Sequence, residues 1–585
     1  MLKRALSLVL SLLLVICIGC NEDTDVPKKT PTQAAFDEFT NDIFIETVSD
    51  NTINLHFTLA YPENHDLDNT QATLGDFGYD YMTCETDHIN ELYDRLNEFS
   101  YEELTAEQQL TYDILKDALQ SEIDSGKYIY FTEALSPLTG YQAQLPVLLA
   151  NYTFRCKEDV ENYLALLENF DEYFAKIMEF EKLKSEKGYF MPDFMAHEVI
   201  SQCLVFIEDI EKNYLIETFN STVEELNFLS EAEKNAFRIK NIEYVTNDVV
   251  KGYETIIDGL DNLLGTGKND AGLYYYTDGS EYYSHLVRCA TGSAKSVDTL
   301  QTITAEYIED SLQEIYSLMI NDAALVDELD AFSFKSAEPD EILEELKQAI
   351  KEDFPDLPDT TCKVFSVHES LEQYLSPAFF IVPPVDDTFN NVIYINNYYS
   401  NNANLFTTLA HEGYPGHLYQ NVYAAHKNLP LVRNMLNYPG YTEGWATYAE
   451  YYSYYISGLS TKLADVLVLN DSATLGIYAY LDMAIHDDGW EYEDVCEYLS
   501  IFGLNDAEVA LEIYHTIIEN PAEYLSYFIG YMEIMELKEN ACEMLGDNFT
   551  LKQFHTFLLD IGPAPFDIIN EYMEEAFTSN GDTEK

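Results

Sequence analysis

Basic residues are scarce in this 585-residue sequence, in which 31 lysines and arginines stand against 104 aspartates and glutamates, giving a formal net charge of −73. A chain of this charge repels nucleic acid and anionic membrane surfaces, so we expect neither as a partner. The acidic residues are spread along a chain that is 47% hydrophobic, which indicates a folded protein rather than a disordered acidic tail. The charge fits a protein that must stay soluble outside the cell.

Paired cysteines are also missing. Seven of the nine cysteines follow the first twenty residues, and they are widely separated and never form a C-x-x-C pair. This pattern supports neither a disulfide framework nor a cysteine zinc site. We expect most of these thiols to be small buried side chains.

Long hydrophobic runs are confined to the N-terminus. Met1–Cys20 begins with a basic pair and continues into the apolar stretch Leu6–Ile18, which is typical of an export signal and too short for a comfortable membrane span. The stretch ends in a Gly-Cys pair that resembles a bacterial lipobox, with an ordinary signal peptide as the alternative. We expect lipidation of Cys20, residues 21–34 as a flexible linker, and an extracytoplasmic protein tethered to the bacterial membrane only through this anchor.

The length is ample for two lobes. Residues 35–267 carry apolar side chains at helical spacings and predict an N-terminal helical lobe without chemistry of its own. A glycine-rich seam then leads into a catalytic lobe over residues 268–585. Asn391–Ile395 is the clearest strand candidate, and because a lone strand is hard to stabilise, it predicts a small sheet.

The chemistry is concentrated in residues 408–420, TLAHEGYPGHLYQ. His411 and His417 lie six residues apart, Glu412 directly follows the first, and Glu443 comes 26 positions after the second. Two imidazoles, a distant carboxylate and an adjacent glutamate are the parts of a hydrolytic zinc site, in which three ligands leave one position open for water.

The spacing of the two histidines does not suit one regular helix. Six residues turn through about 600°, which leaves the side chains about 120° apart. Pro415 and Gly416 fall between them, so the helix could end at residues 413–416 and a second could open at His417. The spacing alone fits equally well a helix stop followed by an unrelated histidine.

Several sequence blocks resemble, in order, those of the domain-of-unknown-function 885 (DUF885) family, which is grouped with zincin-like zinc peptidases. They are H-E-x-x-P-G-H-x-x-Q at 411–420, E-G-W-A-x-Y-x-E at 443–450, D-x-x-I-H-x-x-G-W at 482–490, and further matches at 527–530 and 545–555. The resemblance implies a mainly α, zincin-like fold, with two lobes around a cleft and a small sheet near the metal site. It also implies that the strand at 391–395 presents a free edge to an extended peptide.

The same resemblance implies roles for individual residues. Zn²⁺ would be the cofactor, held by His411, His417 and Glu443, and Glu412 would take the proton from the bound water. Glu450 lies seven residues after Glu443, on nearly the same helical face, and could orient a ligand imidazole or be a solvated charge.

Helical zincin-like peptidases often add a tyrosine or histidine that donates to the oxyanion. His486 and Tyr527 are the two candidates, and either could instead only pack between helices. We favour His486, because Asp482 lies one helical turn before it and could hold its imidazole. The phenol of Tyr527 is a neutral donor that needs no such partner.

The sequence therefore predicts an exported zinc-dependent hydrolase, most simply a peptidase acting on peptide bonds. A metal-dependent amidase acting on a non-peptide or cell-wall amide is one alternative. A lipoprotein that binds without catalysis is another, although a binder has no need of Glu412 beside the metal. The sequence does not separate the first two hypotheses.

Overall fold

The computed structural model describes residues 29–67, 71–334, 337–367, 372, 376–399 and 404–579. The export signal and Cys20 lie outside these residues.

Helix α2 begins at Pro31, so the last part of the expected linker is helical. A capping box fixes this start, because the Thr30 hydroxyl accepts from the Gln33 amide and the Gln33 side chain accepts from the Thr30 amide. Across the described ranges, every helix is too short or too polar to cross a membrane.

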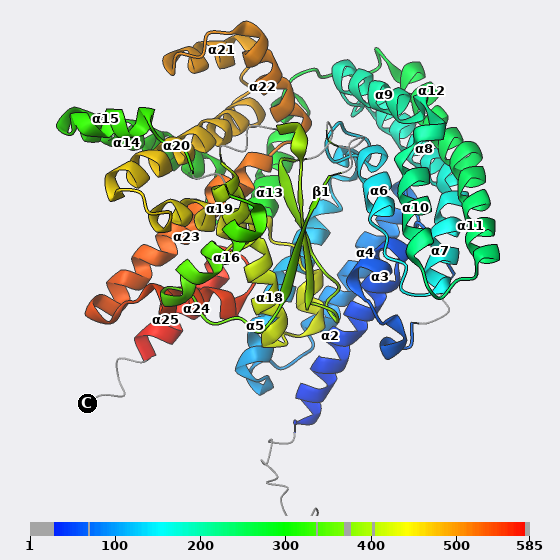
Figure 1. Cartoon of the computed structure of the whole chain (residues 1–585), viewed down its shortest axis with the longest axis horizontal. Helices are drawn as coiled ribbons and strands as arrows, with labels where there is room; N and C mark the ends of the chain where they lie inside the picture. The colour runs from blue at the N-terminus through cyan, green and yellow to red at the C-terminus, as the bar shows by residue number, and fades with distance from the viewer. Residues whose placement is uncertain are drawn as a thin grey trace, which may run out of the picture.

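Helices dominate the described chain, as the sequence predicts (Figure 1). The first part contains α2 (Pro31–Ser49), α3 (Thr52–Thr58), α4 (Tyr79–Leu96), α5 (Ala106–Ser125), α6 (Tyr141–Ala150), α7 (Lys157–Glu168), α8 (Phe170–Lys187), α9 (Asp193–Glu208), α10 (Tyr214–Glu225), α11 (Glu231–Tyr244) and α12 (Val250–Leu263). The later part contains α13 (Gly279–Thr291), α14 (Val297–Asn321), α15 (Ala323–Asp330), α16 (Pro339–Ala349), α17 (Leu405–Glu412), α18 (His417–Lys427), α19 (Pro439–Ile456), α20 (Thr461–His486), α21 (Tyr492–Ile501), α22 (Ala507–Glu519), α23 (Glu523–Leu545), α24 (Leu551–Ile561) and α25 (Phe566–Ser579).

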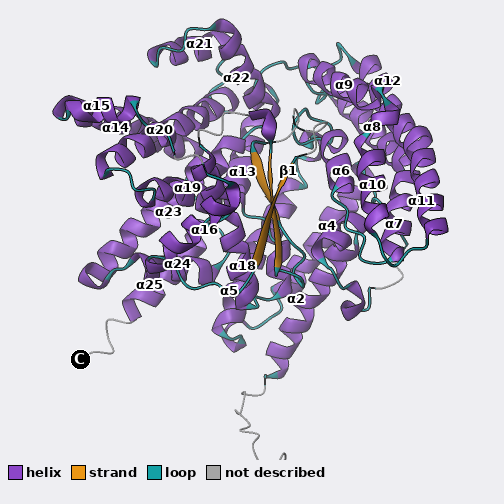
Figure 2. Cartoon of the chain, in the orientation of Figure 1, coloured by secondary structure: helices purple, strands orange, loops and turns teal. Residues whose placement is uncertain are grey.

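A small sheet lies among these helices (Figure 2). It contains β1 (Thr361–Ser366), β2 (Ala378–Ile381) and β3 (Asn390–Ile395) in the order β1-β3-β2. The predicted strand is confirmed as β3, but it is central, parallel to β1 and antiparallel to β2. The expectation that this strand presents a free edge is therefore wrong, and among the described residues the outer edge that contacts Glu412 belongs to β2.

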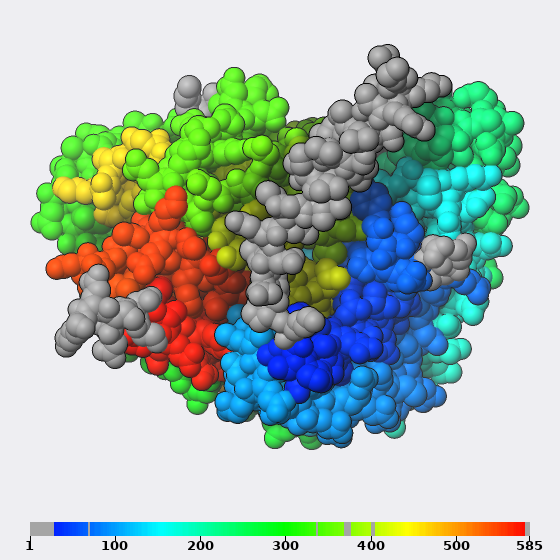
Figure 3. Space-filling view, turned by 90° about the horizontal axis from the view of Figure 1, so that it is seen from below, coloured from blue at the N-terminus to red at the C-terminus, as the bar shows by residue number. Residues whose placement is uncertain are grey.

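Two large hydrophobic clusters hold the helices together. One is formed mainly by α6 to α12 with parts of α20, α21 and α22, and the other by the sheet with α16 to α19 and α23 to α25. In Figure 3 the olive segment that contains α17 and α18 is set back between the blue N-terminal helices and the green and red C-terminal ones. The segment with the predicted chemistry is thus recessed.

Helices α19 and α23 meet main chain to main chain. A Cβ atom built on Gly530 would lie 2.1 Å from the carbonyl oxygen of Gly440, and one built on Gly444 would lie 2.4 Å from the carbonyl carbon of Gly530. No side chain other than hydrogen fits at these positions. The contact comes directly after Glu443 on one helix and three residues after Tyr527 on the other.

Gly530→Ala should therefore lower the free energy of unfolding by about 1–3 kcal/mol, because the added methyl group must push two main chains apart. Chemical denaturation measures this loss. Glu543→Ala, at an exposed position of the same helix, is the matched control and should change stability by less than about 0.5 kcal/mol. A Gly530→Ala protein as stable as the wild type would contradict the close contact.

Candidate metal centre

His411 and His417 are brought together by a break between two helices. α17 ends at Glu412 and α18 begins at His417, as the proline and glycine between them predict. The Gly416 amide donates to the carbonyl of Ala410 at 2.9 Å, and a Cβ atom on Gly416 would lie 1.7 Å from the carbonyl oxygen of His411. Only glycine fits this joint. The two imidazole centroids lie 4.8 Å apart with ring planes at 82°.

Glu443 reaches the two imidazoles from α19. Its Oε2 atom lies 3.6 Å from Nε2 of His411 and 3.4 Å from Nε2 of His417. One ligand atom from each of these three residues lies within 4.8 Å of the other two. The buried indole of Trp445 donates to the carbonyl of Pro415 at 2.8 Å, which ties α19 to the joint between α17 and α18.

These three residues fit a divalent cation such as Zn²⁺. Glu443 Oε2 is buried and has no hydrogen-bond partner among the described residues, although two ring nitrogens face it. Two donors that each lie about 2.0–2.2 Å from one tetrahedral zinc ion are separated by about 3.3–3.6 Å. The measured separations of 3.4 and 3.6 Å lie in this range and exceed an ordinary hydrogen bond.

The charges of these groups are strongly coupled. Burial raises the pKa of Glu443, but the two imidazoles outweigh it and hold the pKa well below its usual range. Burial lowers the pKa of His411, but the carboxylates of Glu443 and Glu450 outweigh it and raise the pKa well above its usual range. The carboxylates thus hold positive charge at this point, whether it is a proton or a metal ion.

Glu450 makes the orienting contact predicted for it. Its Oε2 atom lies 3.2 Å from Nδ1 of His411, on the side of the ring opposite the atom that faces Glu443. A carboxylate in this place fixes the rotation of the imidazole and its tautomer.

Glu412 is held at the outer edge of the sheet. Its side chain is buried, and Oε2 accepts from the main-chain amide of Phe380 in β2 at 2.8 Å. Burial raises the pKa of the Glu412 carboxyl, against the smaller opposing effects of His411 and His417. No sequence pattern points to Phe380, since it contributes a main-chain amide that any residue carries.

Tyr527 lies beside the three residues. Its ring stacks on that of His411 at a centroid distance of 6.3 Å and an angle of 22°. Burial raises its pKa first, and the charges of the nearby carboxylates of Glu443, Glu523 and Glu412 raise it further. Tyr527 is therefore a neutral donor at the site.

His486 is not at this site, and its expected role as an oxyanion donor does not hold. Its Nδ1 accepts from the amide of Leu273 and its Nε2 donates to the carbonyl of Ile517, each at 3.0 Å. The ring is 1% exposed, and burial lowers its pKa to about 4. Asp482 does not hold the imidazole either, because both of its oxygens accept from the amide of Ala522.

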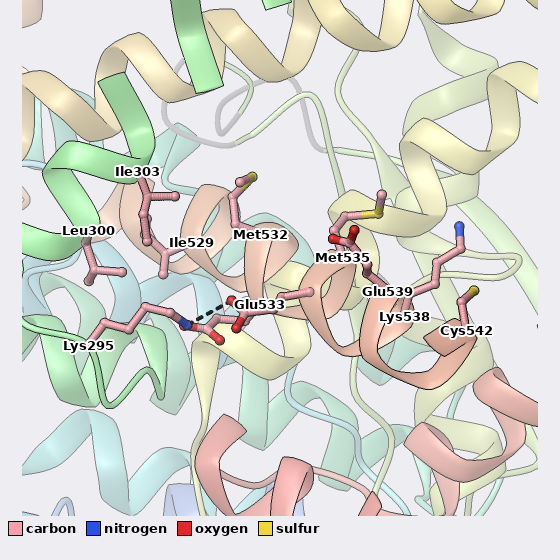
Figure 4. Close-up of a pocket in the computed structure, with 11 residues that line it drawn as sticks. Lys295, Leu300, Ile303, Ile529, Met532, Glu533, Met535, Lys538, Glu539 and Cys542 are labelled. Atoms are coloured by element: carbon pink, nitrogen blue, oxygen red, sulfur yellow. Dashed lines mark hydrogen bonds and ion pairs between the residues drawn. The ribbon is translucent and has the colours of Figure 1, made fainter. Parts of the chain in front are cut away.

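A separate cavity of about 570 Å³ lies between α14 and α23 (Figure 4). Its lining is largely apolar, and Lys295 is paired there with Glu533 at 2.6 Å. The described residues that line it include none of the predicted site residues.

Comparisons with known proteins place the fold. The family described as "Bacterial protein of unknown function (DUF885)" matches residues 65–573. The crystal structure of a candidate lipoprotein from Colwellia psychrerythraea is similar over 94% of this chain and 99% of its own, with a TM-score of 0.81 and 18% identity. The structure of a candidate lipoprotein of unknown function from Shewanella oneidensis is similar over 92% of this chain and 99% of its own, with a TM-score of 0.65 and 18% identity. No curated protein matches the chain. At this identity the likeness establishes a common fold.

Proposed function

The chain belongs to the DUF885 family of bacterial proteins, and from this premise we propose that it is a zinc-dependent peptidase with a zincin-like, two-lobed architecture. One observation carries the proposal. Within the described residues, a buried carboxylate oxygen without a hydrogen-bond partner faces two imidazole nitrogens at 3.4 and 3.6 Å, directly beside a second buried glutamate. The lipoproteins that share the fold support an exported protein anchored through Cys20.

Different residues of the site would bind the metal ion, orient a ligand imidazole and transfer the proton. His411, His417 and Glu443 would hold the ion, and Glu450 would keep the ring of His411 turned toward it. A bound Zn²⁺ supplies a Lewis acid and lowers the pKa of a water molecule. Glu412 takes the proton of the attacking water and passes it to the leaving amine, a task for which a buried carboxyl of raised pKa is suited.

The outer edge of β2 is the proposed path of the substrate. The amide of Phe380 points away from β3 and toward Glu412. Main-chain groups of alternate residues in an antiparallel strand face the same side, so those of Ala378 share this edge. A peptide that adds to the edge would pass directly by the proposed base.

A library of short peptides, incubated with zinc-loaded protein and analysed by mass spectrometry, tests the proposal. We expect cleavage that a chelator abolishes and added zinc restores. A zinc-loaded protein that leaves every peptide intact would overturn the peptidase proposal in favour of the amidase or the non-catalytic binder.

Tyr527→Phe should lower kcat by about 10²–10³-fold, because it removes one donor to the oxyanion and leaves the ring in place. Zinc content and the thermal unfolding midpoint should stay at wild-type values. Tyr531→Phe makes the same deletion one turn later on α23, where the ring packs on Tyr451, and serves as the matched control. Equal turnover by the two variants would remove Tyr527 from the mechanism.

A further inference from the structure

A cavity of about 910 Å³ opens where α6, α9 and the end of α22 approach the start of β2. Its lining joins residues that are far apart in the sequence. Its lining includes the polar residues Gln142, Glu198, Gln202, Glu519 and Asn520, and Pro377, which directly precedes β2.

Carboxyl groups dominate the charged lining, which comprises Glu198, Glu208, Asp209, Lys212 and Glu519. The single cation of this set, Lys212, is paired with Asp209 at 2.9 Å. Glu198 and Glu519 both line the cavity, and burial together with the charge of Glu198 raises the pKa of Glu519 to about 8. Among the described residues of its lining, the cavity thus contains a carboxyl pair without a cationic partner.

Asn520 provides independent evidence that the cavity can accept a hydrogen-bond donor. Its side chain is 8% exposed, and its Nδ2 donates to the carbonyl of Thr516 at 3.1 Å. Its Oδ1 has no hydrogen-bond partner within the described part of the chain. Burying an amide oxygen without a hydrogen-bond donor costs free energy, and an N–H or O–H group of a ligand would remove that cost.

The cavity adjoins the proposed substrate path. Pro377 directly precedes β2, and an extended chain covers about 10 Å over the three residues from there to Phe380, whose amide binds Glu412. Asn520 comes just before α23, whose first turns carry Tyr527. The edge of β2 and the start of α23 therefore both lead from the metal centre to the cavity.

We infer that this cavity is a substrate subsite that takes a cationic nitrogen group of a peptide lying along β2. The inference rests on the proposed peptidase function and names its substrate class. The group is the side chain of a lysine or arginine, or a free amino terminus. It would donate to the Glu198–Glu519 pair and to Oδ1 of Asn520, giving the carboxyl pair its counter-charge.

Equilibrium binding to zinc-loaded Glu412→Gln protein, in which turnover is disabled, tests the subsite. The probes are labelled pentapeptides in which lysine is compared with norleucine at each position, with free and acetylated amino termini. At one position, or at the terminus, the charged peptide should bind about tenfold more tightly, as one charge-assisted hydrogen bond implies. The position that responds distinguishes a side chain from an amino terminus.

Glu519→Gln and Glu198→Gln, added to this background, should bring the ratio of charged to neutral binding toward one. Glu211→Gln removes a nearby exposed carboxylate that does not line the cavity and should leave the ratio unchanged.

Equal binding of charged and neutral peptides at every position overturns the subsite. Cleavage of the same peptides by the wild type would then still support the peptidase. Charge-selective binding that Glu519→Gln abolishes supports the subsite, even where the wild type cleaves nothing and the peptidase proposal fails.

Discussion

Glu412→Gln should retain zinc and lose turnover by about 10²–10⁴-fold, the range that a positioned general base contributes. The carbonyl oxygen of glutamine can still accept from the amide of Phe380, so the side chain keeps its place at the edge of β2. It cannot take a proton from water. The variant therefore separates the chemical step from metal binding and from folding.

Elemental analysis of the purified variant, followed by single-turnover kinetics, measures both effects. Glu341→Gln makes the same change at an exposed position of α16 and should behave as the wild type. If Glu412→Gln turns over peptide at the wild-type rate, another group is the base. If it loses zinc as well, Glu412 contributes to binding the ion.

Glu443→Ala should lose zinc, and with it all metal-dependent turnover. Changing a residue that only supports a ligand costs about 10–100-fold in metal affinity, and removing a ligand should cost more. The change also leaves His411 and His417 facing each other without the carboxylate between them. The loss of affinity should therefore exceed that of any other single change at the site.

Competition with a chelator of known affinity measures this loss, with Glu450→Ala as the graded comparison. Glu450 contacts His411 at the ring nitrogen far from Glu443, so its removal should weaken zinc binding by about 10–100-fold and leave a loaded enzyme at saturating zinc. Wild-type affinity in Glu443→Ala would show that the third ligand is misassigned. Glu450 would then become the next candidate.

The residues of the candidate metal centre could be predicted from two signals together, the resemblance of the sequence blocks to the DUF885 family and the local chain chemistry that positions them. Pro415 and Gly416 predict the break between α17 and α18, and the break explains how a six-residue spacing brings two imidazoles together. The seven-residue interval from Glu443 to Glu450 places both carboxylates on one face of α19, where both reach His411.

His486 could not be placed in this way. The four-residue interval from Asp482 indicates that the two side chains share a helical face, but not which neighbours that face meets. Those neighbours are the main chains at Leu273 and Ile517, which only the tertiary structure brings to α20. From the sequence alone, a histidine whose two ring nitrogens bind the main chain cannot be distinguished from a catalytic histidine.

The sheet shows the same limit. The β-branched pattern of β3 is visible in the sequence, but β2 is only four residues long and offers too few positions for an alternating pattern. Because the pairing partners of a strand depend on long-range contacts, neither the central place of β3 nor the role of the β2 edge could be predicted.

The glycine contact between α19 and α23 sets the distance between the two helices, and with it the distance from Glu443 to Tyr527. A helix spacing set by side chains changes whenever a core residue at the contact changes size, whereas here main chain meets main chain and no larger side chain lies between the two glycines. Sequence divergence elsewhere in the core can shift the two helices as one unit, and the distance from Glu443 to Tyr527 is then preserved. Relatives that retain glycines equivalent to Gly444 and Gly530 should therefore retain the same spacing between ligand and hydroxyl, whatever residues fill the surrounding core.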